Sequence, residues 1–398
     1  NSYTIDFGDG TILTNQTGPV FHTYVSPGTY TVTLTGIFKR IKFFESSTTH
    51  KIRTIQQWGT NEWASMKSAF STCQFLNVYA TDIPNLSQVT DASYMFSSTL
   101  GSTPVSSFNS WDVSNVTNMS YMFAGGGFSQ PIDNWDVSNV TNMKGMFAAA
   151  IYFNQPLNSW DVSNVVEMGD MFKHAISFNQ PLNNWDVSNV TQLNGMFWNA
   201  TAFNQPLNEW NVSNVIDMYL MFYYASAFNQ PLNSWDVSNV VSMHNMFNQA
   251  IAFNQPLNNW NVNNLLYCGS MFNQAISFNQ DISNWNIVNS VDFIDFLNGS
   301  ALDVSNYDAL LDKFVALGQA NKTLGAVGIK YCNVADRNTL IQSGWTITGD
   351  VLHEDCELGM LENDVKEMVL LYPNPTRDVV NLEVEDGLEV KYITIYNM

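Results

Sequence analysis

One tryptophan recurs along most of the chain at an almost constant interval. It stands at positions 111, 135, 160, 185, 210, 235, 260 and 285, which is one step of 24 residues followed by six steps of 25. A unit of 25 residues is too short to enclose a hydrophobic core of its own. Each copy must therefore bury its apolar side against the next copy, and the sequence predicts a repeat solenoid.

The copy around Trp160 shows the pattern within one unit. Leu157, Trp160 and Val162, with Asp161 between the last two, predict a short parallel strand that points Trp and Val inward and Asp outward. Apolar residues then follow at steps of three and four over residues 165–172, which predicts a helical turn on the opposite wall. The expected fold class is an α+β repeat solenoid, with short parallel strands on one face and helical turns on the other, flanked by β-sandwich fragments.

Two further sets of equivalent positions, here called columns, are predicted to be structural. An asparagine column would stack its amides so that each donates to the carbonyl of one coil and accepts from the next. The Met and Phe columns would fill the space between coils, and Cys268 replaces Met in one of them as a buried thiol. The asparagines stand at positions 115, 139, 164, 189, 214, 239 and 264.

An outward column of acids and amides is the candidate binding face. Strand alternation would place its members one coil apart, about 4.8 Å from their neighbours. Solvent could screen these carboxylates, some could protonate, or calcium could bridge them through oxygen ligands. The candidate face comprises Asp112, Asp136, Asp161, Asp186, Asn211, Asp236 and Asn261, with Ser159, Asn184 and Glu209 beside them; the five aspartates are the calcium candidates.

The repeat also carries a family resemblance. The run from Trp111 through Asp-Val-Ser-Asn-Val-Thr-Asn to Met119, with Met122-Phe123 after it, resembles the signature of the BspA-like surface-protein family. The resemblance covers residues 58–357 and implies a fold related to leucine-rich repeats. It also implies a secreted or bacterial cell-surface protein with an adhesive or binding role, and it brings no catalytic residues with it.

The regions on either side of the repeats have sequence patterns that predict separate domains and caps. Residues 1–45, with Asp6-Phe-Gly-Asp9-Gly and Pro27-Gly28 turns, resemble a fragment of the polycystic-kidney-disease (PKD) domain, a β-sandwich. We expect an N-terminal cap over 46–96, eight repeats over 97–300, and an α/β cap over 301–357 with helices at 306–319 and 336–342. Cys332 and Cys356 bracket this last cap, and in an oxidising compartment a disulfide between them would close the loop and stabilise the protein by about 3 kcal/mol.

The C-terminal segment is expected to be a sorting signal for export. Residues 358–368 have the acidic, unpatterned composition of a linker. Tyr372-Pro-Asn-Pro375 then resembles the start of the type IX (Por) secretion sorting domain, placed at 369–398. The resemblance implies recognition by the secretion machinery and an extracellular or outer-membrane surface location.

Composition and net charge argue against some classes of binding partner. Fifteen Lys and Arg stand against 35 Asp and Glu, a net charge of −20, which argues against nucleic acid and anionic membranes as partners. No apolar run approaches the roughly 18 residues of a membrane span, so no membrane insertion is expected. No paired acids, metal-ligand cluster or nucleophile triad stands out, and no cofactor or catalytic residue is predicted.

The predicted function is therefore non-enzymatic binding of an extracellular protein or glycan through the acidic, polar face. Two alternatives stay open. The chain could be a carbohydrate-binding or spacer region of a larger secreted polysaccharide-degrading enzyme, or it could be a self-associating structural component of the cell surface.

Overall fold

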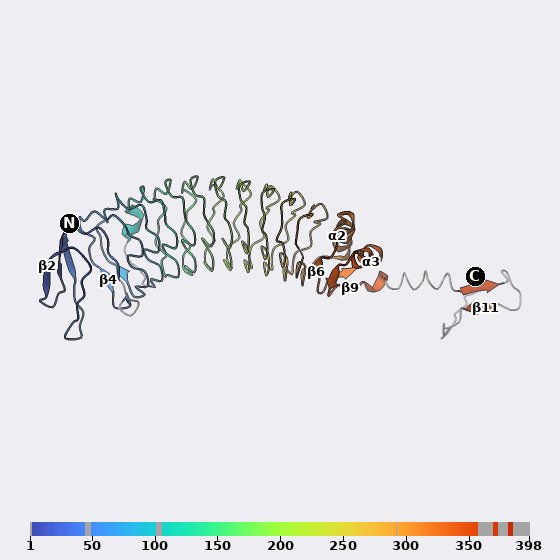
Figure 1. The fold of residues 1–398 in the computed structure, drawn as a ribbon, viewed down its shortest axis with the longest axis horizontal. Coiled ribbons are helices and arrows are strands. Elements are labelled where there is room, and N and C mark those ends of the chain that lie inside the picture. The colour runs from blue at the N-terminus through green and yellow to red at the C-terminus, as the bar shows by residue number, and fades with distance from the viewer. Residues whose placement is uncertain are drawn as a thin grey trace.

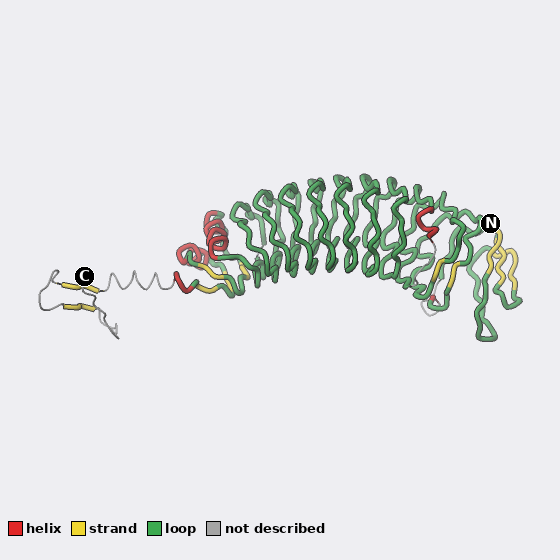
Figure 2. The backbone as a smooth tube through the Cα atoms, turned by 180° about the vertical axis from the view of Figure 1, so that it is seen from behind, coloured by secondary structure: helices red, strands yellow, loops and turns green. Residues whose placement is uncertain are grey.

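The repeats lie side by side in an elongated, gently curved array (Figure 1). The computed structural model describes residues 2–43, 49–100, 106–291 and 293–356, and the two strands β10 (Val369–Tyr372) and β11 (Asn381–Val384). Short strands mark the two ends of the array, whereas its middle consists of turns and loops (Figure 2). Among the described residues, no helix has the length and apolar character needed to cross a membrane.

The N-terminal sheet has three antiparallel strands. They are β1 (Tyr3–Asp6), β2 (Ile12–Gln16) and β3 (Thr33–Gly36), in the order β2-β1-β3. Ile5 and Phe7 are its buried apolar residues. Residues 38–43 already pack against the array, since the Phe38 ring lies 5.2 Å from that of Trp63 and the Lys39 carbonyl accepts from the Ala64 amide at 2.8 Å.

Coils of the array begin before the first recurrent tryptophan. Strand β4 (Thr54–Ile55) pairs in parallel with β5 (Asn77–Val78). The amides of Met66 and Phe70 donate to the carbonyls of Asp91 and Met95, as their counterparts do in the following coils up to Met243 and Phe247. A 3-10 helix at Ser106–Ser110 follows. The segment expected as a terminal cap therefore contains coils of the same construction.

One wall of the array carries a continuous parallel ladder. A single-residue parallel bridge joins each coil to the next at positions 91, 118, 142, 167, 192, 217, 242 and 267. Beyond each bridge, alternate amides reach the following coil; those of Met168, Asp170 and Phe172 donate to the carbonyls of residues 192, 194 and 196 at 2.8–3.2 Å. The ladder thus runs through the segment expected to be helical, and that prediction is wrong.

The apolar spacing in this segment has a different cause. The Met171 amide donates to the Met168 carbonyl (3.2 Å) and the Ala175 amide to Phe172 (3.0 Å), so three-residue turns return an apolar side chain inward every three or four residues. Asp170 and His174 then take left-handed backbone, with φ of 58° and 57°, which ends each turn before a helix can grow. Spacing alone does not distinguish these turns from a helix.

The predicted strand around Trp160 has no assigned secondary structure and forms no backbone ladder with its equivalents in neighbouring coils. The predicted directions are nevertheless correct, because Trp160 and Val162 are buried and Asp161 is exposed. Side chains join the coils here. The Trp185 Nε1 donates to the Leu157 carbonyl at 2.9 Å, and the Asn189 Nδ2 donates to the Ser163 carbonyl at 2.7 Å. The donor half of the role expected of the asparagine column is confirmed, and the acceptor half stays a prediction.

Aromatic rings stack along the interior of the array. The rings of Trp160 and Trp185 lie 6.5 Å apart and within 2° of parallel, and those of Phe153 and Phe178 lie 6.0 Å apart at 10°. Within one coil, the centroids of Phe147 and Phe153 are 4.0 Å apart. Such stacking adds to area burial, so these columns form the hydrophobic core that no single copy could build.

An α/β cap closes the C-terminal end of the array. Helices α2 (Val304–Ala316) and α3 (Val334–Gln342) lie near two parallel pairs, β6 (Thr323–Gly325) with β8 (Thr346–Thr348) and β7 (Lys330–Tyr331) with β9 (Val351–Leu352). A parallel bridge from Phe293 to Leu324 continues the ladder into this cap. In Figure 1, β4 and β6 lie toward the concave edge of the array and α2 toward the convex edge.

Strands β10 and β11 pair antiparallel, with Val369 opposite Val384. The predicted linker at 358–368, and the rest of the predicted sorting domain at 369–398, lie outside the described residues.

Candidate functional site

The acid and amide column predicted as the binding face has a structural role in every coil. Each member accepts a hydrogen bond from the backbone amide two residues later. Asp161 Oδ1 lies 3.1 Å from the Ser163 amide, and Asn211 Oδ1 lies 3.2 Å from that of Ser213. Both Asp and Asn can form this turn, which explains why both occur in the column. The exposed members are Asp112, Asp136, Asp161, Asp186, Asn211, Asp236 and Asn261.

The same turn favours the ionised aspartate. The Ser163 hydroxyl, and then its backbone amide, hold the pKa of Asp161 below its usual value, and Ser114 lowers the pKa of Asp112 in the same way. Protonation is therefore not how these two carboxylates relieve their mutual repulsion.

Calcium gains no preformed site from this column. In the part of the chain that the structure describes, no three carboxylates offer oxygens within 4.8 Å of one another. Ser159, Asn184 and Glu209 lie in the exposed turn before each tryptophan, where the Ser159 hydroxyl donates to the Asp133 carbonyl at 3.0 Å and the Glu209 amide to Asn183 Oδ1 at 3.2 Å. A role of this face in binding stays a prediction.

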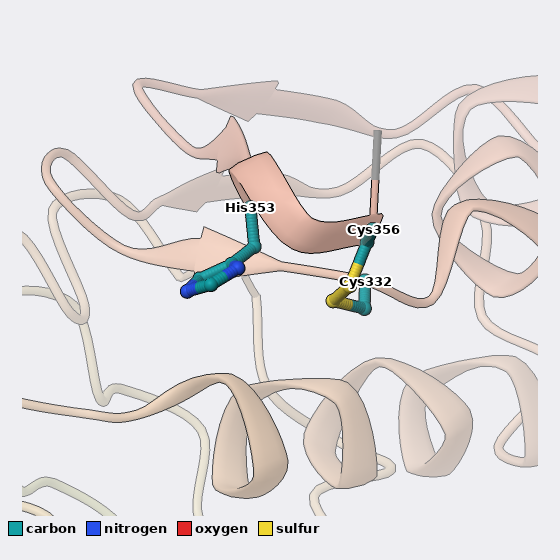
Figure 3. Close-up of side chains that lie close together, drawn as sticks. All are labelled: Cys332, His353 and Cys356. Carbon is teal, nitrogen blue, oxygen red and sulfur yellow. A yellow bond between two sulfur atoms is a disulfide. The ribbon is translucent and has the colours of Figure 1, made fainter. Parts of the chain in front are cut away.

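Cys332, His353 and Cys356 form a compact group in the C-terminal cap (Figure 3). The two sulfurs are joined in a disulfide, with Cα atoms 5.5 Å apart, between the same two cysteines that the sequence pairs. A disulfide leaves no thiolate to bind a metal, so this group fastens the cap. Cys73 and Cys268 are buried and lie outside this disulfide; Cys268 Sγ lies 3.1 Å from Ser290 Oγ, and burial raises the pKa of the Cys73 thiol to about 12.

The ladder wall differs from the other walls in its side chains. We define the ladder face as the positions equivalent to residues 167–174 in each coil that are not buried. Between residues 68 and 312 the sequence contains only two Lys or Arg, Lys144 and Lys173, and only two His, His174 and His244. All four lie on this face.

Partly exposed aromatic rings gather around these basic groups. Lys173 Nζ lies 3.8 Å from the centroid of the Trp198 ring, within the range of a cation–π contact. The Trp198 ring lies 5.6 Å from that of Tyr223, which in turn lies 4.6 Å from Tyr224. We call this cluster the aromatic patch; it comprises Lys173, His174, Trp198, Tyr219, Tyr223, Tyr224 and His244.

Local structure holds the patch in place. Tyr219 and His244 occupy the same position in adjacent coils and stack at 5.8 Å and 10°. His174 Nδ1 lies 2.9 Å from Asn199 Nδ2. Because these side chains sit on hydrogen-bonded backbone and contact one another, a ligand would have to immobilise few of them on binding.

Around the patch, both lysines of the ladder face are paired with carboxylates, and Asp217 adds one further carboxylate. Lys173 Nζ lies 3.6 Å from Asp170, and Lys144 Nζ lies 3.8 Å from Glu167 one coil away. Burial, and then the charge of Lys173, lowers the pKa of His174, so that this imidazole is neutral at pH 7. Aromatic groups and paired lysines thus occupy one face of an acidic molecule, without a net positive charge.

Sequence reasoning missed this patch because its residues do not recur. The position of Lys144 is held by Gly169, Asn194, Tyr219 and His244 in the following coils. The signal in the sequence that could have found the patch is the set of positions that vary from copy to copy while the rest of the unit repeats.

Comparison with known families covers most of the chain. Residues 38–127, 126–230 and 206–308 match the family described as Mycoplasma protein of unknown function, DUF285. The chain belongs to this family. Residues 1–37 match the PKD domain, which confirms the N-terminal resemblance and ends it where the array begins. No curated protein matches the chain.

Proposed function

We propose that this DUF285 protein is a non-enzymatic binding or adhesion protein, secreted or displayed at a bacterial surface. Its array acts as a leucine-rich-repeat-like solenoid that holds the ladder face toward an extracellular partner. The acidic column on the other wall would keep the molecule soluble and discourage contacts with like-charged surfaces.

One observation carries this proposal. The recurrent Trp, Phe, Asn and Asp columns stabilise the array itself, through packing, hydrogen bonds and turns. The ladder face instead varies from coil to coil and gathers all four basic side chains of residues 68–312 beside exposed rings. Exposed aromatic and polar residues placed on a rigid scaffold favour recognition of a partner.

The flanking regions support an extracellular setting. A disulfide fastens the C-terminal cap, and disulfides persist in oxidising compartments. The PKD match and the resemblance of Tyr372-Pro-Asn-Pro375 to a type IX sorting domain agree with export.

A binding panel on the full chain tests the proposal. The immobilised protein would be exposed to purified extracellular-matrix proteins and polysaccharides at physiological salt, with calcium and with chelator, while light scattering records its oligomeric state. We expect saturable binding of one partner class by a monomer, without turnover of any polysaccharide. Concentration-dependent assembly with no binding would instead support the structural-component alternative, and hydrolysis of a polysaccharide would overturn the non-enzymatic function.

A further inference from the structure

We propose that the aromatic patch is a binding site for a neutral glycan chain that lies along the axis of the array. This inference rests on the proposed binding function and names the ligand class and the residues that recognise it.

The exposed rings supply the apolar part of such a site. Tyr219 and Tyr224 are 40% and 42% exposed, whereas the internal Trp and Phe are almost completely buried. Inside the array, neighbouring rings of a column stack nearly parallel and cover one another's faces. In the patch, Tyr219 keeps this arrangement on His244, whereas Tyr223 lies at 65° to Trp198 and at 89° to Tyr224. The exposed side of Tyr224 can pack against the C–H groups of a sugar, whereas one face of Trp198 already carries Lys173.

Polar groups beside the rings supply the hydrogen-bonding part. Asn199, Asp217 and Asn245 are half-buried on the ladder face, and His174 and His244 lie among them. Amide, carboxylate and imidazole groups together offer donors and acceptors, which is what sugar hydroxyls require. A few polar groups placed around an apolar surface are typical of ligand sites.

Charge decides between neutral and charged glycans. The two lysines on this face each lie within 4 Å of a carboxylate, and the whole chain carries a net charge of −20. A sulfated or uronic-acid glycan would therefore approach an acidic molecule without a net positive patch to attract it. A neutral glycan meets no such repulsion.

The arrangement of the patch favours a chain over a single sugar. Lys173, Trp198 and Tyr223 occupy the same position in three successive coils. Parallel-bonded coils repeat at about 4.8 Å, so equivalent side chains form a row along the array axis. Successive units of a linear polymer could contact successive coils of this row.

The chain itself supplies the test variant. The column of Trp198 and Tyr223 holds Asn at 248 and 273, and the column of Tyr224 holds Gln at 249 and 274. The triple variant Trp198→Asn, Tyr223→Asn, Tyr224→Gln therefore carries residues that the array already accommodates. The matched control is Asp136→Asn, Asp161→Asn, Asp186→Asn, since Asn211 and Asn261 occupy that column. The single variant Tyr224→Gln, which changes one exposed side chain, guards against misfolding of the triple variant.

Binding of the full chain would be measured on an array of linear neutral glucans, mannans and xylans, with uronic-acid and sulfated glycans and matrix proteins as separate arms. We expect a neutral glycan to bind, the triple variant to lose at least about tenfold in affinity, the single variant to lose less, and the Asp control to match the wild type.

Three outcomes would overturn this inference. A neutral glycan that binds the wild type and the triple variant equally would place the site elsewhere. Binding only to charged glycans, or only to a matrix protein, would make the ligand class wrong while the proposed binding function stands. Absence of binding in every arm would remove the proposed function as well.

Discussion

The interior columns and the ladder face of this protein differ in how much their residues vary from coil to coil. At the tryptophan column every copy has the same residue, because each ring must fit between its neighbours and, from Trp135 onward, donates to a carbonyl of the preceding coil. At the ladder-face position of Lys144, five successive coils have Lys, Gly, Asn, Tyr and His. The backbone beneath is hydrogen-bonded in the same way in each coil. A repeat therefore separates the residues that build the array from those free to recognise a partner.

Removing an interior ring should have the largest effect on stability. Phe203 is fully buried, 4.0 Å from Phe197 in its own coil and 6.0 Å from Phe178 in the preceding one. Phe203→Ala leaves a cavity in the middle of the array, and we expect the free energy of unfolding to fall by about 3–5 kcal/mol. Urea denaturation followed by tryptophan fluorescence measures this loss. A loss below about 1 kcal/mol would show that the rings do not form a close-packed core.

Removing the disulfide should cause the second-largest loss of stability. Replacing Cys332 and Cys356 by Ser removes the constraint on the loop between them and should destabilise the cap by about 3 kcal/mol. Calorimetry of the wild type with and without reductant provides the comparison, and reductant should leave the Ser variant unchanged. An unaltered melting profile in the reduced wild type would mean that the cap is held by its packing alone.

Removing one amide of the asparagine column should reduce the free energy of unfolding by less than either of these changes. Asn189 donates to the Ser163 carbonyl at 2.7 Å on a solvent-exposed edge. Asn189→Ala removes one neutral hydrogen bond, and we expect a loss of about 1 kcal/mol. Asn189→Asp keeps the size of the side chain but replaces the donor by an acceptor, and it should cost at least as much. If both variants unfold at the wild-type urea concentration, the stacked amides are not structural.

Replacing the aspartates of the turn column by Asn should have the smallest effect. Asn forms the same turn at Asn211, so Asp161→Asn should change the free energy of unfolding by less than about 0.5 kcal/mol at pH 7. Asp161→Ala removes the acceptor and should be the more destabilising of the two. Thermal melts of both variants make the comparison, and an Asn variant as unstable as the Ala variant would contradict the turn role.

The pH dependence of this column has a defined sign. Hydrogen bonds hold the pKa of Asp112 and Asp161 below its usual value in the folded state. Their contribution to stability is therefore present above the unfolded pKa of about 3.9 and lost as pH falls through the lower folded values. Asn variants at both positions should lose less stability than the wild type between about pH 4 and pH 2. An identical acid profile would show that these hydrogen bonds do not favour the ionised form.

Periodicity predicted the parts of the fold that repeat. The inward Trp160 and Val162, the outward Asp161 and the donating asparagines follow from residue type and spacing, since each recurs in register. The ladder was placed on the wrong wall because three-residue turns and a helix give the same apolar spacing, and only the left-handed backbone at Asp170 and His174 separates them.

The candidate site escaped prediction for the opposite reason. Trp198 and Tyr223 appear once each in a single column that other repeats fill with Ala, Lys or Asn, so no period marks them. Their proximity depends on which residues adjacent coils bring together, and this required the true position of the ladder.

The most direct test of this division is one substitution made in each region. Trp210 lies in the interior, 3% exposed, with Nε1 donating to the Leu182 carbonyl at 2.9 Å, whereas Trp198 lies on the ladder face in the preceding copy. Urea unfolding of Trp210→Asn and Trp198→Asn would be compared with that of the wild type. We predict a loss of more than about 3 kcal/mol for Trp210→Asn and less than about 1 kcal/mol for Trp198→Asn. Equal losses would contradict the separation of scaffold from recognition face.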